Sequence, residues 1–342
     1  MDFPPLTSQH PVVTFSVVPP SAPSAPRRRG LLVALLLSLA GMGGCDRIQR
    51  QLSDDNAAAA QSADPAWQRD SLLLSSTPTV LFRVLDLPVG RVVSPIATTT
   101  AQGFRVLSMA SRGWKAFDVN YLYAGKTLRT IEDGRPAREL VLKRGMWELG
   151  AQLDSIESCQ RLVPAGMVDA PAGARLAIAG PISALKPVTP LSVAELQSAM
   201  STIPTLVAPS VGIGPSMLSR YTREVHTLAT GNGARPSILV IYDDPEQVAD
   251  SVIDVAQRPR QFVVILDKGV YGYRPTFSFK TLGNARTAPR MRWLDYVDVD
   301  RDGKAELFFG ITANKKYDAT VALRFENDAW RETMRAVVRC QG

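Results

Sequence analysis

An acidic loop near the C-terminus is the stretch of the sequence best suited to chemistry. Asp298, Asp300 and Asp302 alternate with other residues, a glycine follows, and Glu306 ends the run. Ca²⁺ takes six to eight oxygen ligands, and a tight loop supplies them by turning alternate carboxylates inward around a glycine at the sixth place. The spacing therefore predicts a calcium site formed by these four carboxylates and the backbone carbonyl of Lys304, with water completing the shell.

The residues around the loop indicate which kind of calcium motif it is. An EF-hand needs a bidentate Glu at the twelfth place, which is Phe309 here, whereas the ninth place is Glu306. The flanks Trp293–Val297 and Leu307–Thr312 have the composition of strands rather than helices. The loop therefore resembles the FG-GAP or VCBS-type repeat, a β-hairpin around D-x-D-x-D-G-x-x-[DE]-L, over about residues 290–325.

The sequence holds one copy of this motif, whereas a full FG-GAP propeller repeats it in every blade. Glu132-Asp133-Gly134 with Glu139 echoes it without the upstream aspartates, and we expect an ordinary turn there. The single loop is expected to hold one hairpin in a smaller β-domain, with a structural role for calcium. The alternative is a solvated acidic turn that binds nothing. Extracytoplasmic calcium would fill even a site with a Kd of roughly 10⁻⁴–10⁻³ M.

Candidates for catalysis are few. His226 is the one histidine after the expected cleavage site, so zinc sites with two or three histidines are excluded and a Ser-His-Asp triad would have to use it. We expect His226 to be a packed or solvent-facing strand residue. Asp243 and Asp244, with Asp295, could form the acid pair of a glycosidase, although Asp-Asp-Pro is more typical of a turn. No catalytic residue is assigned.

Four aromatic residues alternate along a predicted hairpin: Tyr271, Tyr273, Phe277 and Phe279. Aromatic faces at strand spacing could stack on a ligand, but they more often fill a core. We expect core packing here.

The charge balance is mildly basic. The formal net charge is +7, and +5 remains when residues 1–44 are removed. Lys and Arg are scattered after that segment, so no nucleic-acid partner is expected. Attraction to anionic lipid head groups is the plainer consequence.

The N-terminal segment has the pattern of an export signal. Three arginines, Arg27–Arg29, precede the apolar run Leu31–Met42, which fits a signal h-region and is too short to span a bilayer. The following Met42-Gly43-Gly44-Cys45 resembles the lipobox of bacterial lipoproteins. That resemblance implies a lipid on Cys45 and a cell-envelope location facing the periplasm or the surface, with inner or outer membrane left open. A plain signal peptide cleaved nearby is the alternative.

The cysteine count fits an oxidising compartment. Once Cys45 carries a lipid, Cys159 and Cys340 remain, and we predict a disulfide between them. A loop of about 180 residues closed in this way would stabilise the fold by roughly 5 kcal/mol in the chain-entropy model. Two separate buried thiols are the alternative.

The rest of the sequence predicts a mainly β fold: an antiparallel meander of hairpins with few short helices and a C-terminal calcium-loop hairpin. Ser192 and Glu195 have capping-box spacing and predict one short helix. Strands are expected at 79–85, 104–109, 117–123, 127–131, 139–143, 221–229, 237–242, 261–266 and 275–282. The expected divisions are an export signal with a long extension (1–44), a flexible tether (45–70), an N-terminal β region (71–165), a loop-rich segment (166–210) and a C-terminal β region (211–342).

Together these features favour a lipid-anchored envelope protein that is not an enzyme and that binds or supports other molecules, stabilised by calcium. Its expected partners are the membrane, through the lipid, and an envelope protein or glycan. The alternative is an envelope hydrolase that acts on glycan or peptide substrates through carboxylates. Two acids facing each other in a cleft away from the loop would favour that alternative.

Overall fold

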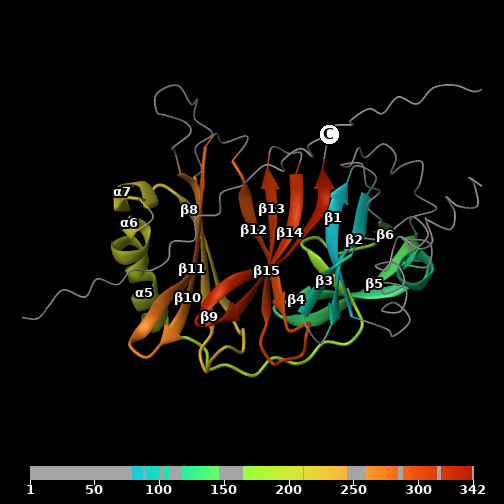
Figure 1. Cartoon of the computed structure of the whole chain (residues 1–342), viewed down its shortest axis with the longest axis horizontal. Helices are drawn as coiled ribbons and strands as arrows, with labels where there is room; N and C mark the ends of the chain where they lie inside the picture. Colours follow the sequence, from blue (N-terminus) through green and yellow to red (C-terminus); the bar gives the residue numbers. More distant parts are fainter. Residues whose placement is uncertain are drawn as a thin grey trace, which may run out of the picture. The chain divides into compact units, whose positions relative to one another are not determined.

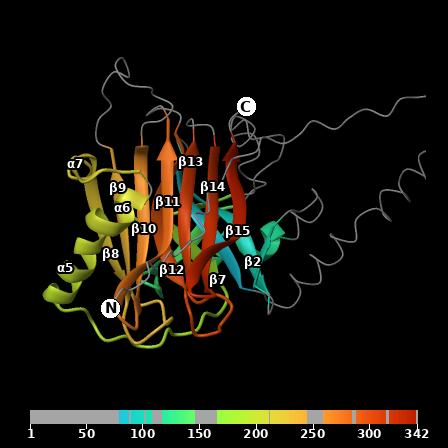
Figure 2. The same cartoon turned by 60° about the vertical axis from the view of Figure 1, so that its left-hand side comes forward.

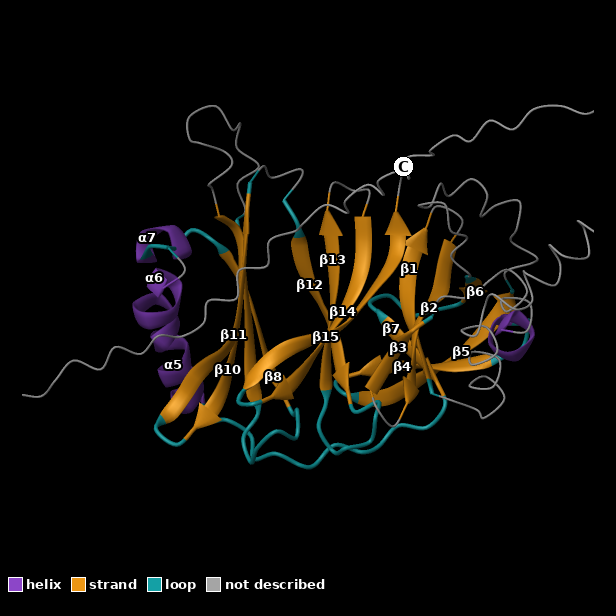
Figure 3. Ribbon diagram, in the orientation of Figure 1, coloured by secondary structure: helices purple, strands orange, loops and turns teal. Residues whose placement is uncertain are grey.

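A computed structural model gives the fold of the folded body. It describes residues 79–87, 90–100, 103–107, 117–145, 165–210, 212–244, 259–283, 288–313 and 317–340. Antiparallel hairpins dominate these residues, and the helices are few and short, so the expected mainly β class is confirmed (Figure 3).

The first sheet closes on itself. It has seven strands in the order β1-β7-β4-β5-β6-β2-β3, and an additional pairing of β1 with β2 closes a ring of six strands, to which β3 is added beside β2. The bounds are β1 Val80–Leu87, β2 Gly90–Thr100, β3 Gly103–Val106, β4 Thr127–Glu132, β5 Arg135–Arg144, β6 Gly166–Val168 and β7 Leu176–Ala179. Its enclosed core contains Val80, Phe82, Val93, Leu128 and Leu140, which are all buried.

Two four-stranded antiparallel sheets follow, in the orders β11-β10-β9-β8 and β12-β13-β14-β15 (Figure 1). The bounds in the first are β8 Thr222–Leu228, β9 Ser237–Asp243, β10 Pro259–Gly269 and β11 Gly272–Leu282. Those in the second are β12 Arg290–Val297, β13 Glu306–Ala313, β14 Tyr317–Glu326 and β15 Ala329–Cys340. The helical elements between β7 and β8 are α5 Val193–Thr202, η2 Ile203–Val207, α6 Ala208–Ser210 and α7 Pro215–Leu218.

Alternate residues of the central strands bury two different faces. On β9 and β10, Val240 and Val264 pack under α5 to α7, which cover one face of that sheet (Figure 2). Ile241 and Ile265 point the other way and meet the β12–β15 sheet at Phe309. Strands buried on both faces read as continuous apolar runs, which is why β9, β10 and β13 lack the polar alternation of a surface strand.

The opposite face of the β12–β15 sheet packs on the closed sheet. Phe308, Ala322 and Met334 lie there against Leu81 and Ile178 of β1 and β7. The β12–β15 sheet is therefore the middle layer of the described body, and the acidic loop joins two of its strands.

Several sequence-based expectations need correction. Residues 117–123 are not a strand: Asp118–Leu122 forms a π-helical turn, η1. The reason is the helical spacing of Phe117 and Tyr121, whose rings lie 4.8 Å apart between centroids and pack on Phe82. The hairpin β10–β11 extends past the expected strand end at residue 266 and turns at Val270 and Tyr271, since Gly269 pairs with Gly272.

The segment 166–210 is also less loop-rich than its composition suggested. Its strands β6 and β7 belong to the closed sheet with the preceding β region. Their short Gly, Met and Ala-rich sequences gave no long β-branched run to recognise.

The expected capping box is present: the Glu195 backbone N–H donates to the Ser192 hydroxyl, and the Ser192 backbone N–H donates to the Glu195 carboxylate.

The leader and tether, residues 1–70, lie outside the described residues, and so do Cys45 and Cys159. Lipidation at Cys45 and the disulfide between Cys159 and Cys340 thus stay predictions. No helix in the described ranges is both long and apolar enough to cross a membrane.

Candidate metal centre

The acidic loop connects β12 to β13, and neighbouring segments hold its shape. Val297 and Glu306 form the last register pair of the two strands. The Ala305 backbone N–H donates to the Thr230 carbonyl at 2.8 Å, which fixes the loop to the β8–β9 connection. A Cβ at Gly231 would lie 2.4 Å from the Gly303 carbonyl oxygen, so the approach of these two segments requires glycine there.

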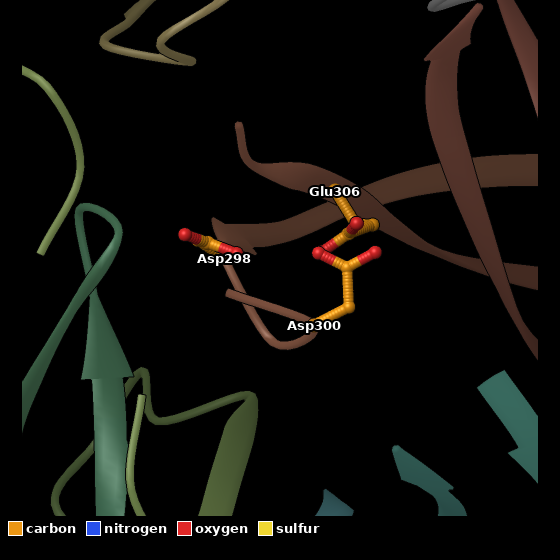
Figure 4. A group of neighbouring side chains, drawn as sticks. All are labelled: Asp298, Asp300 and Glu306. Atoms are coloured by element: carbon orange, nitrogen blue, oxygen red, sulfur yellow. The ribbon is translucent and has the colours of Figure 1, made fainter. Parts of the chain in front are cut away.

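Three of the predicted ligands come together in the fold. One carboxylate oxygen from each of Asp298, Asp300 and Glu306 lies within 4.8 Å of the other two. Figure 4 shows the three side chains. Asp298 is 0% exposed and Glu306 is 1% exposed. The side chain of Asp300 is 8% exposed. Three carboxylates gathered out of water repel one another, so a cation between them would stabilise the arrangement.

Hydrogen bonds within the loop orient these carboxylates. The Gly303 backbone N–H donates to Oδ2 of Asp298 at 2.9 Å, and the Val299 backbone N–H donates to Oε2 of Glu306 at 3.2 Å. The other oxygen of Asp298, Oδ1, is buried and has no hydrogen-bond partner among the described residues. Buried polar atoms in native proteins are mostly satisfied, so an unsatisfied oxygen on a residue of this cluster is available to bind a cation.

Burial changes the acidity of the site. It raises the pKa of Glu306 to about 8, and the nearby negative charge of Asp300 adds to that rise. Burial also raises the pKa of Asp298, although hydrogen bonds from the Gly303 and Arg301 backbone oppose it. Without a cation the site therefore holds a proton in neutral solution, and a divalent ion would displace that proton.

The two other predicted ligands, Asp302 and the Lys304 carbonyl, are not part of this cluster of three carboxylates. Oδ1 of Asp302 accepts a hydrogen bond of 2.8 Å from the Lys304 backbone N–H, and Oδ2 accepts one of 2.8 Å from Arg324. The Asp302 side chain is 35% exposed and does not join the cluster of three. The Lys304 carbonyl stays a predicted ligand.

Arg324 of β14 is a component of the site that the sequence did not reveal. Its Nη2 lies 2.6 Å from Oδ2 of Asp300, and its Nε lies 4.0 Å from Oε1 of Glu306. Burial alone would lower the pKa of Arg324, but the hydrogen bond to Asp302 and the charges of Asp300 and Glu306 raise it above its usual value. A lone basic residue in the apolar alternation of β14 was the available signal.

Comparisons with protein families, with curated proteins and with solved structures give no match to this chain. The likeness to FG-GAP and VCBS-type repeats thus rests on the loop residues and their flanking strands. Those flanks do form the expected antiparallel hairpin, β12 with β13.

The acids considered for catalysis are tied to arginines. Oδ1 of Asp243 lies 2.7 Å from Nη1 of Arg290, and Oδ2 of Asp244 lies 3.0 Å from Nη1 of Arg260. The second pair is buried, with side-chain exposures of 0% for Arg260 and 3% for Asp244. These ion pairs give both acids a structural role where β9 ends and β10 begins.

Two more buried acids have structural partners. Asp267 accepts hydrogen bonds from Ser237, Thr276 and Trp330, which joins the β8–β11 sheet to β15. Asp295 accepts from the backbone of Gly134 and from two other N–H groups. Among the residues that line two pockets in the described part of the chain, Glu139 is the one acid, so neither of these pockets shows facing carboxylates.

The remaining candidates occupy structural positions. His226 lies 2.7 Å from Glu224 through its Nε2 atom, and its ring packs on Trp293 at 5.7 Å between centroids. Phe277 and Phe279 pack on the core between the two four-stranded sheets. Tyr273 packs on the helical side instead, and Tyr271 is fully exposed at the hairpin turn, so the four aromatics share no common face.

Proposed function

We propose that this chain is a lipid-anchored cell-envelope protein that binds an envelope protein or glycan. One calcium ion in the loop Asp298–Glu306 stabilises its β-rich body. The observation that supports the metal is the buried, unpartnered Oδ1 of Asp298 beside Asp300 and Glu306. Carboxylates and a backbone carbonyl are hard oxygen ligands, which suit calcium or magnesium rather than zinc or copper. A flexible loop with several carboxylates favours calcium, because magnesium demands octahedral geometry and keeps its water.

The proposed role of the ion is structural. The loop joins two strands of the middle layer and contacts the β8–β9 connection through Ala305 and Thr230. An ion that cancels the repulsion of its carboxylates would therefore stabilise the junction of two sheets. The envelope is a suitable compartment because its calcium supply can fill a weak site.

The support for export and anchoring is the leader sequence, with its arginines, its short apolar run and Cys45. Partners within this proposal are the membrane, through the lipid, and an envelope protein or glycan. The hydrolase alternative has less support, because Asp243 and Asp244 are paired with arginines.

Thermal denaturation tests the metal. The chelated protein is compared with protein in millimolar calcium or magnesium, for the wild type, Glu306→Gln and the control Asp328→Asn in the exposed β14–β15 turn. We expect calcium to raise the Tm of the wild type and the control, magnesium to do less, and Glu306→Gln to lose the response. Equal Tm values with and without calcium in the wild type would contradict the metal site.

Mass spectrometry of the native N-terminus tests the anchor separately. A mature chain that begins at a diacylglyceryl-modified Cys45 and is recovered with membranes is expected. An uncleaved, unacylated chain in the cytosol would overturn the envelope assignment and leave the metal question open.

A further inference from the structure

A buried arginine lies between the closed sheet and the β12–β15 sheet. Arg83 of β1 is 8% exposed, and its side chain points out of the closed sheet on the same face as Leu81. A Cβ on Gly310 of β13 would lie 2.9 Å from Nη2 of Arg83, so the guanidinium rests against the backbone of β13. Glycine at this position makes room for a charged group inside the contact.

Two of the three guanidinium nitrogens of Arg83 lack a hydrogen-bond partner among the described residues. These are Nε and Nη1, and both are buried. Burial and the positive charges of Arg175 and Arg292 lower the pKa of Arg83 to about 10, although Asp318 opposes them. A buried cation with open N–H groups is destabilising unless an acceptor reaches them.

Two hydroxyl groups beside Arg83 are also buried without hydrogen-bond partners among the described residues. Ser94 of β2 is the register partner of Arg83, and Thr320 of β14 is the register partner of Gly310. Both residues are buried, and neither Oγ of Ser94 nor Oγ1 of Thr320 has a partner in the described part of the chain. Three strands from two sheets thus place groups that can donate hydrogen bonds near Arg83, and Asp318 of β14 is a carboxylate close enough to attract the guanidinium.

Two exposed arginines lie beside Arg83. Arg175 precedes β7, its carbonyl accepts from the Val84 backbone N–H at 3.0 Å, and its Nη1 donates to the Trp293 carbonyl at 2.6 Å. Arg292 of β12 is the other register partner of Gly310. The three arginines are far apart in the sequence and meet only in the fold, which explains why no basic cluster was visible beforehand.

We propose that Arg83, Ser94 and Thr320, with Arg175 and Arg292 at the rim, form a binding site for a tetrahedral oxyanion, namely a phosphate or sulfate group. Such an anion carries several acceptor oxygens, so it satisfies the open N–H groups of Arg83 and both hydroxyls at once. The two rim arginines draw it from solvent and balance its second charge. The group can be a free ion or can be borne by a sugar or lipid.

Thermal shift and titration calorimetry with inorganic phosphate and inorganic sulfate test the site, against chloride at matched ionic strength. We expect a saturable rise in Tm with both oxyanions and none with chloride. The double variant Arg175→Gln/Arg292→Gln, changed at exposed positions, is expected to bind at least tenfold more weakly. The control Arg138→Gln, at an exposed position of β5, is expected to bind as the wild type does.

Arg83→Met tests the buried ligand. This variant removes the buried charge and also its attraction to Asp318, so its fold and its Tm without phosphate are measured first. The folded variant is expected to show no phosphate response. A response that persists in Arg83→Met would overturn the site. The absence of an oxyanion-specific shift in the wild type would do the same, and would leave water as the partner of Arg83.

Glucose 6-phosphate separates the two sources of the anion. Binding as tight as that of inorganic phosphate supports a site for a phosphate carried on a larger molecule. Binding of the inorganic ions alone supports a site for the free ion.

Discussion

The backbone N–H of Gly134 donates a hydrogen bond of 3.1 Å to Oδ1 of Asp295. Gly134 belongs to the β4–β5 turn of the closed sheet, and Asp295 lies on β12 just before the acidic loop. The Asp133 backbone N–H adds a bond of 3.2 Å to Oδ2 of the same carboxylate. The turn that looked ordinary in the sequence therefore docks on the strand that leads into the proposed metal site.

Gly134→Ala tests this junction. A Cβ there would lie 2.6 Å from Cε2 of Tyr296, and the backbone has a φ of +76°. We expect a loss of about 1–3 kcal/mol in the free energy of unfolding from overpacking, in addition to the backbone strain. Denaturant unfolding measures it. Gly125→Ala is the control, since its φ of +83° is similar and nothing lies within 4 Å of its Cβ. Equal losses in both variants would show that the contact with Tyr296 contributes nothing.

Asp295 gives the junction a pH dependence. Burial raises the pKa of Asp295 to about 6, against the opposing hydrogen bonds from the Tyr296, Gly134 and Asp133 backbone. Between the usual pKa of an aspartate and this raised value, the folded protein holds a proton on Asp295 that the unfolded chain has released. The contribution of Asp295 to stability is therefore greatest below about pH 4 and is lost as the pH rises through 6. The expected fall is on the order of 1–3 kcal/mol.

Asp295→Asn should remove this part of the pH profile. Its Oδ1 can still accept from Gly134 and Tyr296, so the fold is retained. Urea unfolding of both proteins in chelator at several pH values measures the difference, because the titration of the metal site is common to both and cancels. A slope between pH 4 and 6 that is identical to the wild type would refute the assignment.

Glu306 should make the stabilisation of the protein by calcium depend on pH. Without a cation, burial and the charge of Asp300 raise the pKa of Glu306 to about 8, so the chelated protein should lose stability as the pH rises from about 4.5 to 8. Calcium takes the place of the proton, and its stabilising effect should therefore grow with pH over that window. Tm values with chelator and with calcium across the range measure this. A calcium effect that shrinks with rising pH would contradict it.

Arg324→Gln tests the positive charge that β14 places beside the acidic loop. Arg324 lies 2.6 Å from Asp300 and 2.8 Å from Asp302, and its removal leaves the carboxylates less neutralised. We expect a lower Tm in chelator and a severalfold tighter calcium Kd, because a like charge leaves the vicinity of the ion. Calorimetry and thermal denaturation measure both quantities.

The control for this charge is Arg274→Gln, which breaks an exposed pair with Asp328. Surface pairs of this kind contribute little, so its stability should stay within about 0.5 kcal/mol of the wild type. Weaker calcium binding in Arg324→Gln would show that the arginine orders the site rather than competing with the ion.

Local patterns predicted much of the fold. The hairpin of β8 and β9, the turn at Asp133-Gly134 and the capping box at Ser192 follow from residues close in sequence. The turn at 117–123 was misjudged because its apolar residues fit both a strand and a helix, and packing of Tyr121 on Phe82 decides between them.

Long-range relationships could not be predicted in the same way. The closure of the first sheet depends on β1 pairing with β2 on one side and with β7, far along the chain, on the other. In the candidate metal centre, spacing predicted the meeting of Asp298, Asp300 and Glu306, because one loop carries all three. Arg324 comes from a different hairpin, so its position depends on the register between β13 and β14.

Calcium titration calorimetry of the folded wild type beside Asp298→Asn tests the central claim most directly. Asp298 carries the buried oxygen without a partner, and asparagine keeps its size while removing its charge. We expect one calcium ion per chain in the wild type and no measurable binding in Asp298→Asn, which should remain folded in chelator. A folded wild type that gives no calcium-dependent heat and no change in Tm would contradict the account.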